Sequence, residues 1–298
     1  MTQMTQVMRP YVFGLLIFLA ACDLPDAGDY AAPLLLAGEA TDSTLMLHAR
    51  LNAADTLDAS GDLSGTPGWA RFEYSLDPAM GKLVRHTPWR QARAEEDYII
   101  RETLTGLYPG RPYYYRLRYG PDTLRTLPTG AHEIRTLDPD QPRPIRLVMV
   151  TGSHYDRFHL GGSFGLGRDT SQGKSGYDGP DAHLGFPAYE AIRLARPDYF
   201  IGNGDNVYYD HPEFEQATDS AGMRRKWHRL FSQPRLRGLL RGVGTYWLKD
   251  DHDYRYDDAD TTGERKPGHT LGMALFPEQV PFPAVPYRTL RMSPDLQL

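Results

Sequence analysis

Two short apolar segments, each followed at once by an acidic loop, constrain the fold of this chain more than any other feature. Residues 198–201 (Asp-Tyr-Phe-Ile) run into Gly-Asn-Gly-Asp-Asn-Val-Tyr at 202–208, and residues 245–248 (Thr-Tyr-Trp-Leu) run into Asp-Asp-His-Asp at 250–253. A polar helical pattern separates them. Short buried strands that alternate with helices predict an α/β sheet. Open sheets of this kind place functional groups at the ends of their strands.

The α/β pattern begins earlier, at an apolar run over residues 145–150 that follows a Pro-rich linker at 138–144. A helix is predicted over 187–195, and the Gly-, Ser- and Asp-rich residues 161–185 are typical of a long loop over a site. We therefore expect one α/β domain from residue 145 to residue 298.

The region before the linker, residues 33–137, has the pattern of an all-β domain. Turn residues separate short alternating runs at 45–51, 70–75, 98–104 and 113–119. The segment 107–115 resembles the turn of fibronectin type III domains in which a corner Tyr bonds back to the backbone. A hairpin with aromatic strands fits the same residues. Either way we expect a sandwich of the fibronectin III or immunoglobulin type that could fold unaided.

The N-terminus has the features of a targeting segment. Arg9 is the only charge before the apolar run 12–21, which is shorter than the roughly 20 residues of a spanning helix and suits a signal peptide. The run ends in Leu-Ala-Ala-Cys at 19–22, which resembles a bacterial lipobox. The resemblance implies a signal peptide over 1–21, a diacylglycerol on Cys22 and a tether over 22–32. The alternative is a plain secretory signal with a chance Cys.

An anchored Cys22 implies export to the bacterial cell envelope and membrane attachment on the periplasmic side. Asp23 resembles a signal for retention at the inner membrane. Cys22 is the only Cys of the chain, so the chain forms no internal disulfide although export would permit one. A net charge of −5 argues against a nucleic-acid-binding patch.

The two acidic loops point to metal chemistry. Carboxylates on neighbouring strand ends repel each other unless a cation lies between them, and hard cations prefer oxygen ligands. A Tyr three residues after an Asp can add a phenolate that favours a ferric ion. Taken alone, each acidic run is more often a solvated surface loop. Two such runs at strand ends of one predicted sheet favour a binuclear metal site.

The same residues carry a resemblance to a known family. Residues 204–208 match the GDxxY motif of purple acid and PhoD-like phosphatases, and 250–252 look like the DDH motif of the PhoD-like group. A β-sandwich before a catalytic domain is also that family's order. From Pro33 onward the chain resembles the PhoD-like alkaline phosphatases, a metallophosphoesterase family, in a lipoprotein form.

The resemblance implies an enzyme that hydrolyses phosphate mono- or diesters outside the cytoplasm. A metal-bound hydroxide would attack phosphorus in a binuclear site that holds iron plus calcium or another hard divalent cation. Asp205 is implied as the metal bridge, Tyr208 as the iron phenolate and Asp251 as a ligand from the second loop. His252 is implied as the catalytic group that stabilises the phosphoryl oxygens or protonates the leaving alkoxide.

Two departures from the family pattern give further candidate ligands. His154 stands where the family usually has a Cys on iron, and its imidazole could ligate a metal, with Asp156 compensating the lost charge. Asp257 stands near a position where related sequences commonly carry Asn, and it either adds a ligand or faces solvent. Asp250 completes the candidate metal set.

A rival hypothesis from another class is a lipoprotein binding module that has lost catalysis and acts through the β-sandwich. We also expect the chain to stop before its catalytic domain is complete, because the family draws ligands from both halves of that domain. After His252 the chain has only His269, in a basic segment expected at the surface, and residues 287–292 look like the start of another strand. The natural ester, the metal pair and the oligomeric state stay open.

Overall fold

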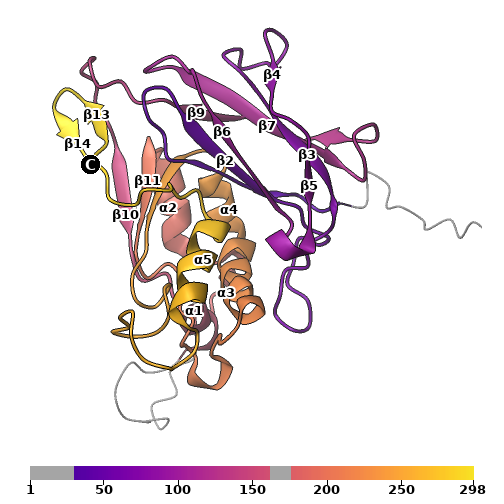
Figure 1. Ribbon diagram of the computed structural model, residues 1–298, viewed down its shortest axis with the longest axis vertical. Helices are drawn as coiled ribbons and strands as arrows, with labels where there is room; N and C mark the ends of the chain where they lie inside the picture. Colours follow the sequence, from indigo (N-terminus) through magenta and orange to yellow (C-terminus); the bar gives the residue numbers. More distant parts are fainter. Residues whose placement is uncertain (1–29, 162–175) are drawn as a thin grey trace, which may run out of the picture.

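The computed structural model describes residues 30–161 and 176–298 (Figure 1). Cys22, the predicted signal peptide and most of the predicted tether lie outside the described residues, as do residues 162–175 of the predicted loop. Among the described residues, no helix has the length and apolar character needed to cross a membrane.

A run of apolar residues at 34–38 (Leu-Leu-Leu-Ala-Gly) forms β1, all of it buried. A strand that is apolar on both faces must be covered on both faces, and β1 lies inside a six-stranded sheet in the order β10-β11-β12-β1-β2-β6. β10, β11, β12 and β1 run parallel, and β1, β2 and β6 run antiparallel. The other members are β10 Leu147–Val150, β11 Tyr199–Asn203, β12 Gly244–Leu248, β2 Leu45–Arg50 and β6 Ile99–Leu104.

The second sheet is antiparallel and is built around β3 and β7. In β7 (Pro112–Gly120) buried and partly buried residues alternate, as expected for a sheet with one face on the core. The Tyr113 hydroxyl accepts a hydrogen bond from the Tyr108 N–H at 2.9 Å, which confirms the predicted corner Tyr. The remaining strands are β3 Gly68–Ser75, β4 Arg85–His86, β5 Arg90–Ala92, β8 Leu127–Pro128 and β9 His132–Arg135.

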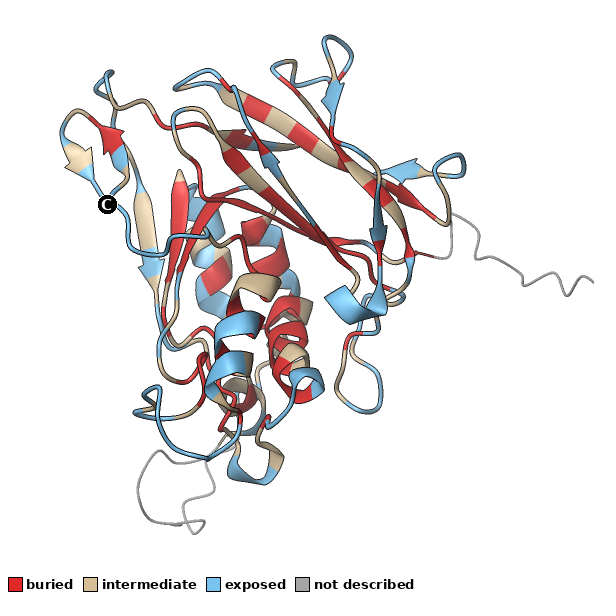
Figure 2. Cartoon of the chain, in the orientation of Figure 1, coloured by how far each residue is buried: buried red, intermediate tan, exposed pale blue. Residues whose placement is uncertain are grey.

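Two buried clusters divide the described residues into three layers (Figure 2). Between the two sheets, Leu35 of β1 and Tyr246 of β12 share a cluster with Phe72 of the second sheet. On the opposite face, Leu36 of β1 shares a cluster with Trp227 of a covering helix. The architecture is therefore sheet, sheet, helix.

The helices cover the face of the first sheet that turns away from the second (Figure 1). α2 occupies the predicted residues, and the Asp219 side chain caps α3 by accepting from the Gly222 N–H at 2.8 Å. His269 is exposed as expected, but it begins a helix, α5. The helices are α1 Tyr155–Leu160, α2 Pro187–Ala195, α3 Ser220–Ser232, α4 Pro234–Leu240 and α5 His269–Gln279; the 3₁₀ turns are η2 Ala94–Glu96, η4 Ala182–Leu184 and η5 Glu213–Glu215.

The predicted linker does not separate two self-contained sheets. β1 pairs in parallel with β12, with Ala37 opposite Gly244, so the region 33–137 contributes three strands to the sheet that carries the acidic loops. The sequence could not reveal this pairing because it joins segments some two hundred residues apart. Near the C-terminus, the predicted strand reduces to a small hairpin, β13 Arg291–Ser293 with β14 Leu296–Gln297.

Candidate metal centre

The acidic loops begin where β11 and β12 end side by side. Close strand packing requires Gly at 202, because a Cβ there would lie 2.4 Å from the Trp247 ring and 2.5 Å from the Asn206 side-chain oxygen. Gly204 and Asp205 then take left-handed backbone conformations, with φ of 75° and 51°. This turn brings the Asp205 side chain toward the loop that follows β12.

Asp205 has one satisfied and one unsatisfied carboxylate oxygen. Its Oδ2 accepts a hydrogen bond from the Tyr208 hydroxyl at 3.0 Å. Its Oδ1 is buried and has no hydrogen-bond partner among the described residues. Burial raises the pKa of Asp205, and the nearby carboxylates of Asp250 and Asp251 raise it further. The hydrogen bond from Tyr208 and the charge of His252 lower it, but the net pKa is raised. A buried oxygen without a donor is costly, and a bound cation would satisfy it.

His252 is buried beside Asp205 and Asp251, and each of the three offers a ligand atom within 4.8 Å of the others. Its Nδ1 lies 2.8 Å from Asp210 Oδ1. Burial lowers the pKa of His252, but the hydrogen bond and charge of Asp210, with the charges of Asp205 and Asp251, raise it overall to about 9. The ring is therefore an imidazolium at neutral pH, which can donate hydrogen bonds or a proton to an anion.

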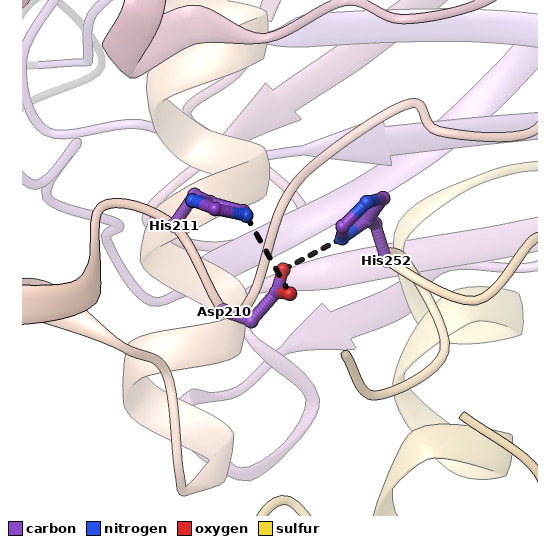
Figure 3. Close-up of side chains that lie close together, drawn as sticks. All are labelled: Asp210, His211 and His252. Carbon is purple, nitrogen blue, oxygen red and sulfur yellow. Dashed lines mark hydrogen bonds and ion pairs between the residues drawn. The ribbon is translucent and has the colours of Figure 1, made fainter. Parts of the chain in front are cut away.

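The structure thus brings together Asp205, Tyr208, Asp251 and His252, and it adds Asp210, which sequence reasoning did not select. Asp210 is buried, and its Oδ2 accepts from the Asp257 N–H at 2.9 Å. The available signal was its place two residues after Tyr208 within the same acidic run. Figure 3 shows Asp210 between His252 and a further histidine, His211.

His154 lies against Tyr208, with the ring centroids 4.1 Å apart in a stacked arrangement. Its Nδ1 accepts from the Arg157 N–H at 3.2 Å and so caps α1. Burial lowers the pKa of His154 to about 4, although Asp156 opposes the shift. A neutral imidazole can ligate a metal, but the one lone pair of the His154 ring already accepts from the Arg157 N–H, so metal binding would require His154 to give up its cap of α1.

The three remaining candidate carboxylates differ in their surroundings. Asp156 is buried, and its two oxygens accept from Lys226 at 2.8 Å and Arg229 at 3.1 Å, so two cations already balance its charge. The exposed Asp250 accepts from the Asp251 N–H at 2.9 Å. The Asp257 side chain is 71% exposed and lies at the rim, 3.6 Å from His252 Nε2.

A buried carboxylate joins the two acidic loops. Asp253 accepts hydrogen bonds from the backbone and side chain of Asn206, at 2.9 and 2.6 Å, and from the Asp250 N–H at 2.6 Å. Burial raises the pKa of Asp253 to about 7 against these hydrogen bonds. Sequence reasoning treated Asp253 only as part of an acidic run, whereas its contacts set the spacing between the loops.

The donor set fits hard metal ions. Asp205 and Asp251 supply carboxylates and Tyr208 supplies a phenol, all of them oxygen ligands of the kind that calcium and ferric ions take. The unpartnered Asp205 oxygen is the observation that favours a cation here.

Comparisons with known proteins agree with this architecture. The family model described as "PhoD-like phosphatase, N-terminal domain" matches residues 35–137. The solved structure of PhoD is similar with a TM-score of 0.60 at 17% identity, covering 89% of this chain and 49% of that chain. A purple acid phosphatase from yellow lupin (Lupinus luteus) seeds is similar with a TM-score of 0.50 at 15% identity, covering 86% and 41%. Among curated protein sequences, none matches.

These findings confirm the predicted fold class and the resemblance to PhoD-like phosphatases. The chain spans about half the length of the PhoD structure that it matches.

Proposed function

We propose that this chain, with its PhoD-like N-terminal domain and its PhoD-like fold, acts in the metal-dependent hydrolysis of phosphate mono- or diesters. The observation that carries the proposal is the buried, unpartnered oxygen of Asp205 beside Tyr208, Asp251 and His252. Such an oxygen costs stability in a metal-free protein, and a cation bound there would satisfy it.

The residues that would hold metal are Asp205, Tyr208 and Asp251, with the neutral His154 ring next to Tyr208. Iron with calcium, or iron with another hard divalent cation, suits this set. Metal ions held here would supply a nucleophile at neutral pH and neutralise the charge of the phosphoryl group.

The chain's own residues then act on the ester. The His252 imidazolium donates to a phosphoryl oxygen or protonates the leaving alkoxide, because its positive charge is retained at neutral pH. Asp210 positions that ring through Nδ1. Asp253 keeps the two loops at a constant spacing through Asn206 and Asp250.

Two substitutions separate metal binding from chemistry. In the full-length protein, Asp205→Asn removes a carboxylate charge, so bound iron and calcium, measured by elemental analysis, should fall together with turnover of aryl phosphate mono- and diesters. His252→Ala should keep the metal content and slow turnover by about 100- to 1,000-fold, the typical loss for one stabilising donor. Asp140→Asn, at an exposed position of the linker, and His183→Ala, at an exposed position of η4, are the matched controls.

Unchanged rates and metal content in both site variants would end the assignment. A parent protein that folds but binds neither iron nor calcium would instead support the rival hypothesis, a binding module that acts through the β-sandwich.

The proposal includes export and lipidation at Cys22, which lies outside the described residues. Its support is the Leu-Ala-Ala-Cys sequence at 19–22 after a short apolar run. In a bacterial host, Cys22→Ser should be released from membranes or accumulate as a longer precursor. A variant that fractionates with membranes and migrates like the parent would refute lipidation.

A further inference from the structure

A cluster of nitrogen ligands lies next to the oxygen-rich loop residues, and the proposed hydrolysis does not use all of it. Asp210, His211 and His252 each offer one ligand atom, and these atoms lie within 4.8 Å of one another. In Figure 3 the Asp210 carboxylate points between the two imidazole rings. Its Oδ1 is 2.8 Å from His252 Nδ1, and its Oδ2 is 3.8 Å from His211 Nε2.

We propose that Asp210, His211 and His252 form a zinc-binding position next to the Asp205 site, with His252 at the boundary between the two. Two imidazoles and one carboxylate are the ligands that zinc takes in sites with three protein ligands and one open position. The oxygen-only ligands Asp205, Tyr208 and Asp251 have the opposite preference, for hard ions.

Two of the three ligands are already held in place. Asp210 and His252 are buried, and the second Asp210 oxygen accepts from the Asp257 N–H at 2.9 Å. Hydrogen bonds of this kind orient the carboxylate ligands of metal sites. Little conformational freedom is therefore lost at these two residues when a metal binds.

His211 has a fixed backbone and an adjustable ring. Its carbonyl oxygen accepts from Lys226 Nζ at 2.6 Å, and Lys226 is itself held by Asp156 at 2.8 Å. The His211 side chain is 34% exposed. Zinc–ligand bonds of about 2.0–2.1 Å place tetrahedral ligands roughly 3–3.5 Å apart, so the His211 ring must move toward Asp210 and His252 when zinc binds.

Binding exchanges one partner of His252 for another. Zinc takes the place of the hydrogen between His252 Nδ1 and Asp210 Oδ1, which is released to solvent, so that the nitrogen and the carboxylate both become metal ligands. All three ligands belong to the described residues.

Isothermal titration of the 298-residue chain with zinc chloride tests the proposal. We expect zinc binding that His211→Ala weakens at least 10-fold, because removing even a group that only orients a metal ligand typically costs about 10- to 100-fold in affinity. His183→Ala, at an exposed position of η4, should leave it unchanged. A Co²⁺ titration followed by visible absorption should show a four-coordinate spectrum that the same variant abolishes.

Comparing the metals bound by Asp205→Asn and by His211→Ala distinguishes the proposed zinc position from the proposed hydrolytic site. Asp205→Asn should keep zinc affinity within about threefold while losing iron and calcium, and His211→Ala should do the reverse. Zinc affinity that is unchanged in His211→Ala, or that is lost in Asp205→Asn alone, would overturn the proposed zinc position. Circular dichroism of both variants establishes that they are folded.

Discussion

Asp205 combines three features that loop residues usually avoid. Its backbone is left-handed at φ 51°, its side chain is partly buried, and one carboxylate oxygen has no donor among the described residues. Each feature costs free energy, and such residues persist where a ligand compensates the cost. The charge of Asp205 also repels Asp250 and Asp251.

Asp205→Asn should therefore raise the stability of the metal-free protein while lowering metal affinity. A neutral amide removes the repulsion, and Asn tolerates the left-handed conformation well. We expect the free energy of unfolding, measured by urea denaturation with a chelator present, to increase by ~1 kcal/mol. With iron and calcium added, the parent should become the more stable of the two. A variant that is less stable than the parent without metal would contradict this account of Asp205.

His48, which lies on β2 and outside the acidic loops, makes the free energy of unfolding depend on pH. Its Nε2 donates to the Glu278 carbonyl at 2.9 Å and so ties β2 to the end of α5. Burial lowers the pKa of His48 to about 4 from 6.5. His48 therefore binds a proton below about pH 6.5 in the unfolded chain but only below about pH 4 in the folded protein. The free energy of unfolding consequently falls as the pH is lowered from 6.5 to 4.

His48→Gln should remove that dependence. Between pH 7 and pH 4, the free energy of unfolding of the parent should fall by ~3 kcal/mol more than that of the variant. This difference corresponds to the shift in the pKa of His48. Urea denaturation at several pH values measures the difference. His86→Gln, at an exposed position on β4, should follow the parent, and parallel curves for parent and His48→Gln would refute the assignment.

At the scale of elements, α3 connects the acidic-loop side of the protein with the N-terminal β-region. Lys226 and Arg229 bind Asp156 at the start of α1. Between them in sequence, His228 places its two ring nitrogens 2.5 Å from Asp62 and 2.7 Å from Asp97. One helix therefore holds both the loop after β10 and two loops of the β-region.

Asp97 is the acceptor on which this connection depends. It also accepts from Arg50 at 3.0 Å and from Gln279 of α5 at 2.9 Å, and its side chain is 5% exposed. Burial alone would raise the pKa of Asp97, but His228 and Arg50 together hold it well below its usual range. Elements from three parts of the chain thus converge on one buried carboxylate.

Asp97→Ala should lower the free energy of unfolding by about 3–5 kcal/mol, because it leaves the buried Arg50 guanidinium, the His228 ring and the Gln279 amide without their shared acceptor. Asp62→Ala should cost only about 1 kcal/mol or less, because the Asp62 side chain is 36% exposed and water replaces it. Guanidinium denaturation compares the two. Equal losses would mean that burial does not set the strength of these ion pairs.

At the scale of the whole molecule, the first sheet unites the regions on either side of the predicted linker. β1 pairs with β12 on one edge and with β2 on the other. Leu34 and Leu36 of β1 pack in the cluster formed mainly by the helices, whereas Leu35 packs between the sheets. The β-region thus depends on the later residues for one strand neighbour and for one whole face of β1.

A fragment of residues 30–137 should consequently fail to behave as an independent domain. Without β12 and the helices, the edge of β1 and its Leu34 and Leu36 side chains would face water, which favours association. We expect concentration-dependent oligomers in analytical ultracentrifugation and a broad urea transition. Leu34→Lys combined with Leu36→Lys should reduce the association. A monomeric fragment with a sharp transition would restore the sequence-based expectation that this region folds unaided.

Local patterns were enough to predict much of this protein. Strand alternation predicted β3 and β7, and apolar spacing predicted α2 at residues 187–195. The resemblance of 107–115 to a fibronectin type III turn implied a corner Tyr, which the structure identifies as Tyr113. The two acidic loops could also be assigned to neighbouring strand ends. These features depend on residues within about ten positions of one another, where backbone geometry alone relates sequence to structure.

Long-range pairing decided the rest. Asp156 and Asp210 are both carboxylates in predicted loops, yet Asp156 meets Lys226, 70 residues away, while Asp210 meets His252, 42 residues away. Whether a carboxylate is neutralised by a cation or left to bind one depends on which strands and helices become neighbours. Which elements become neighbours is decided by the requirement that all apolar faces are buried together, as in the β1–β12 pairing. This arrangement cannot be read from any short stretch of sequence.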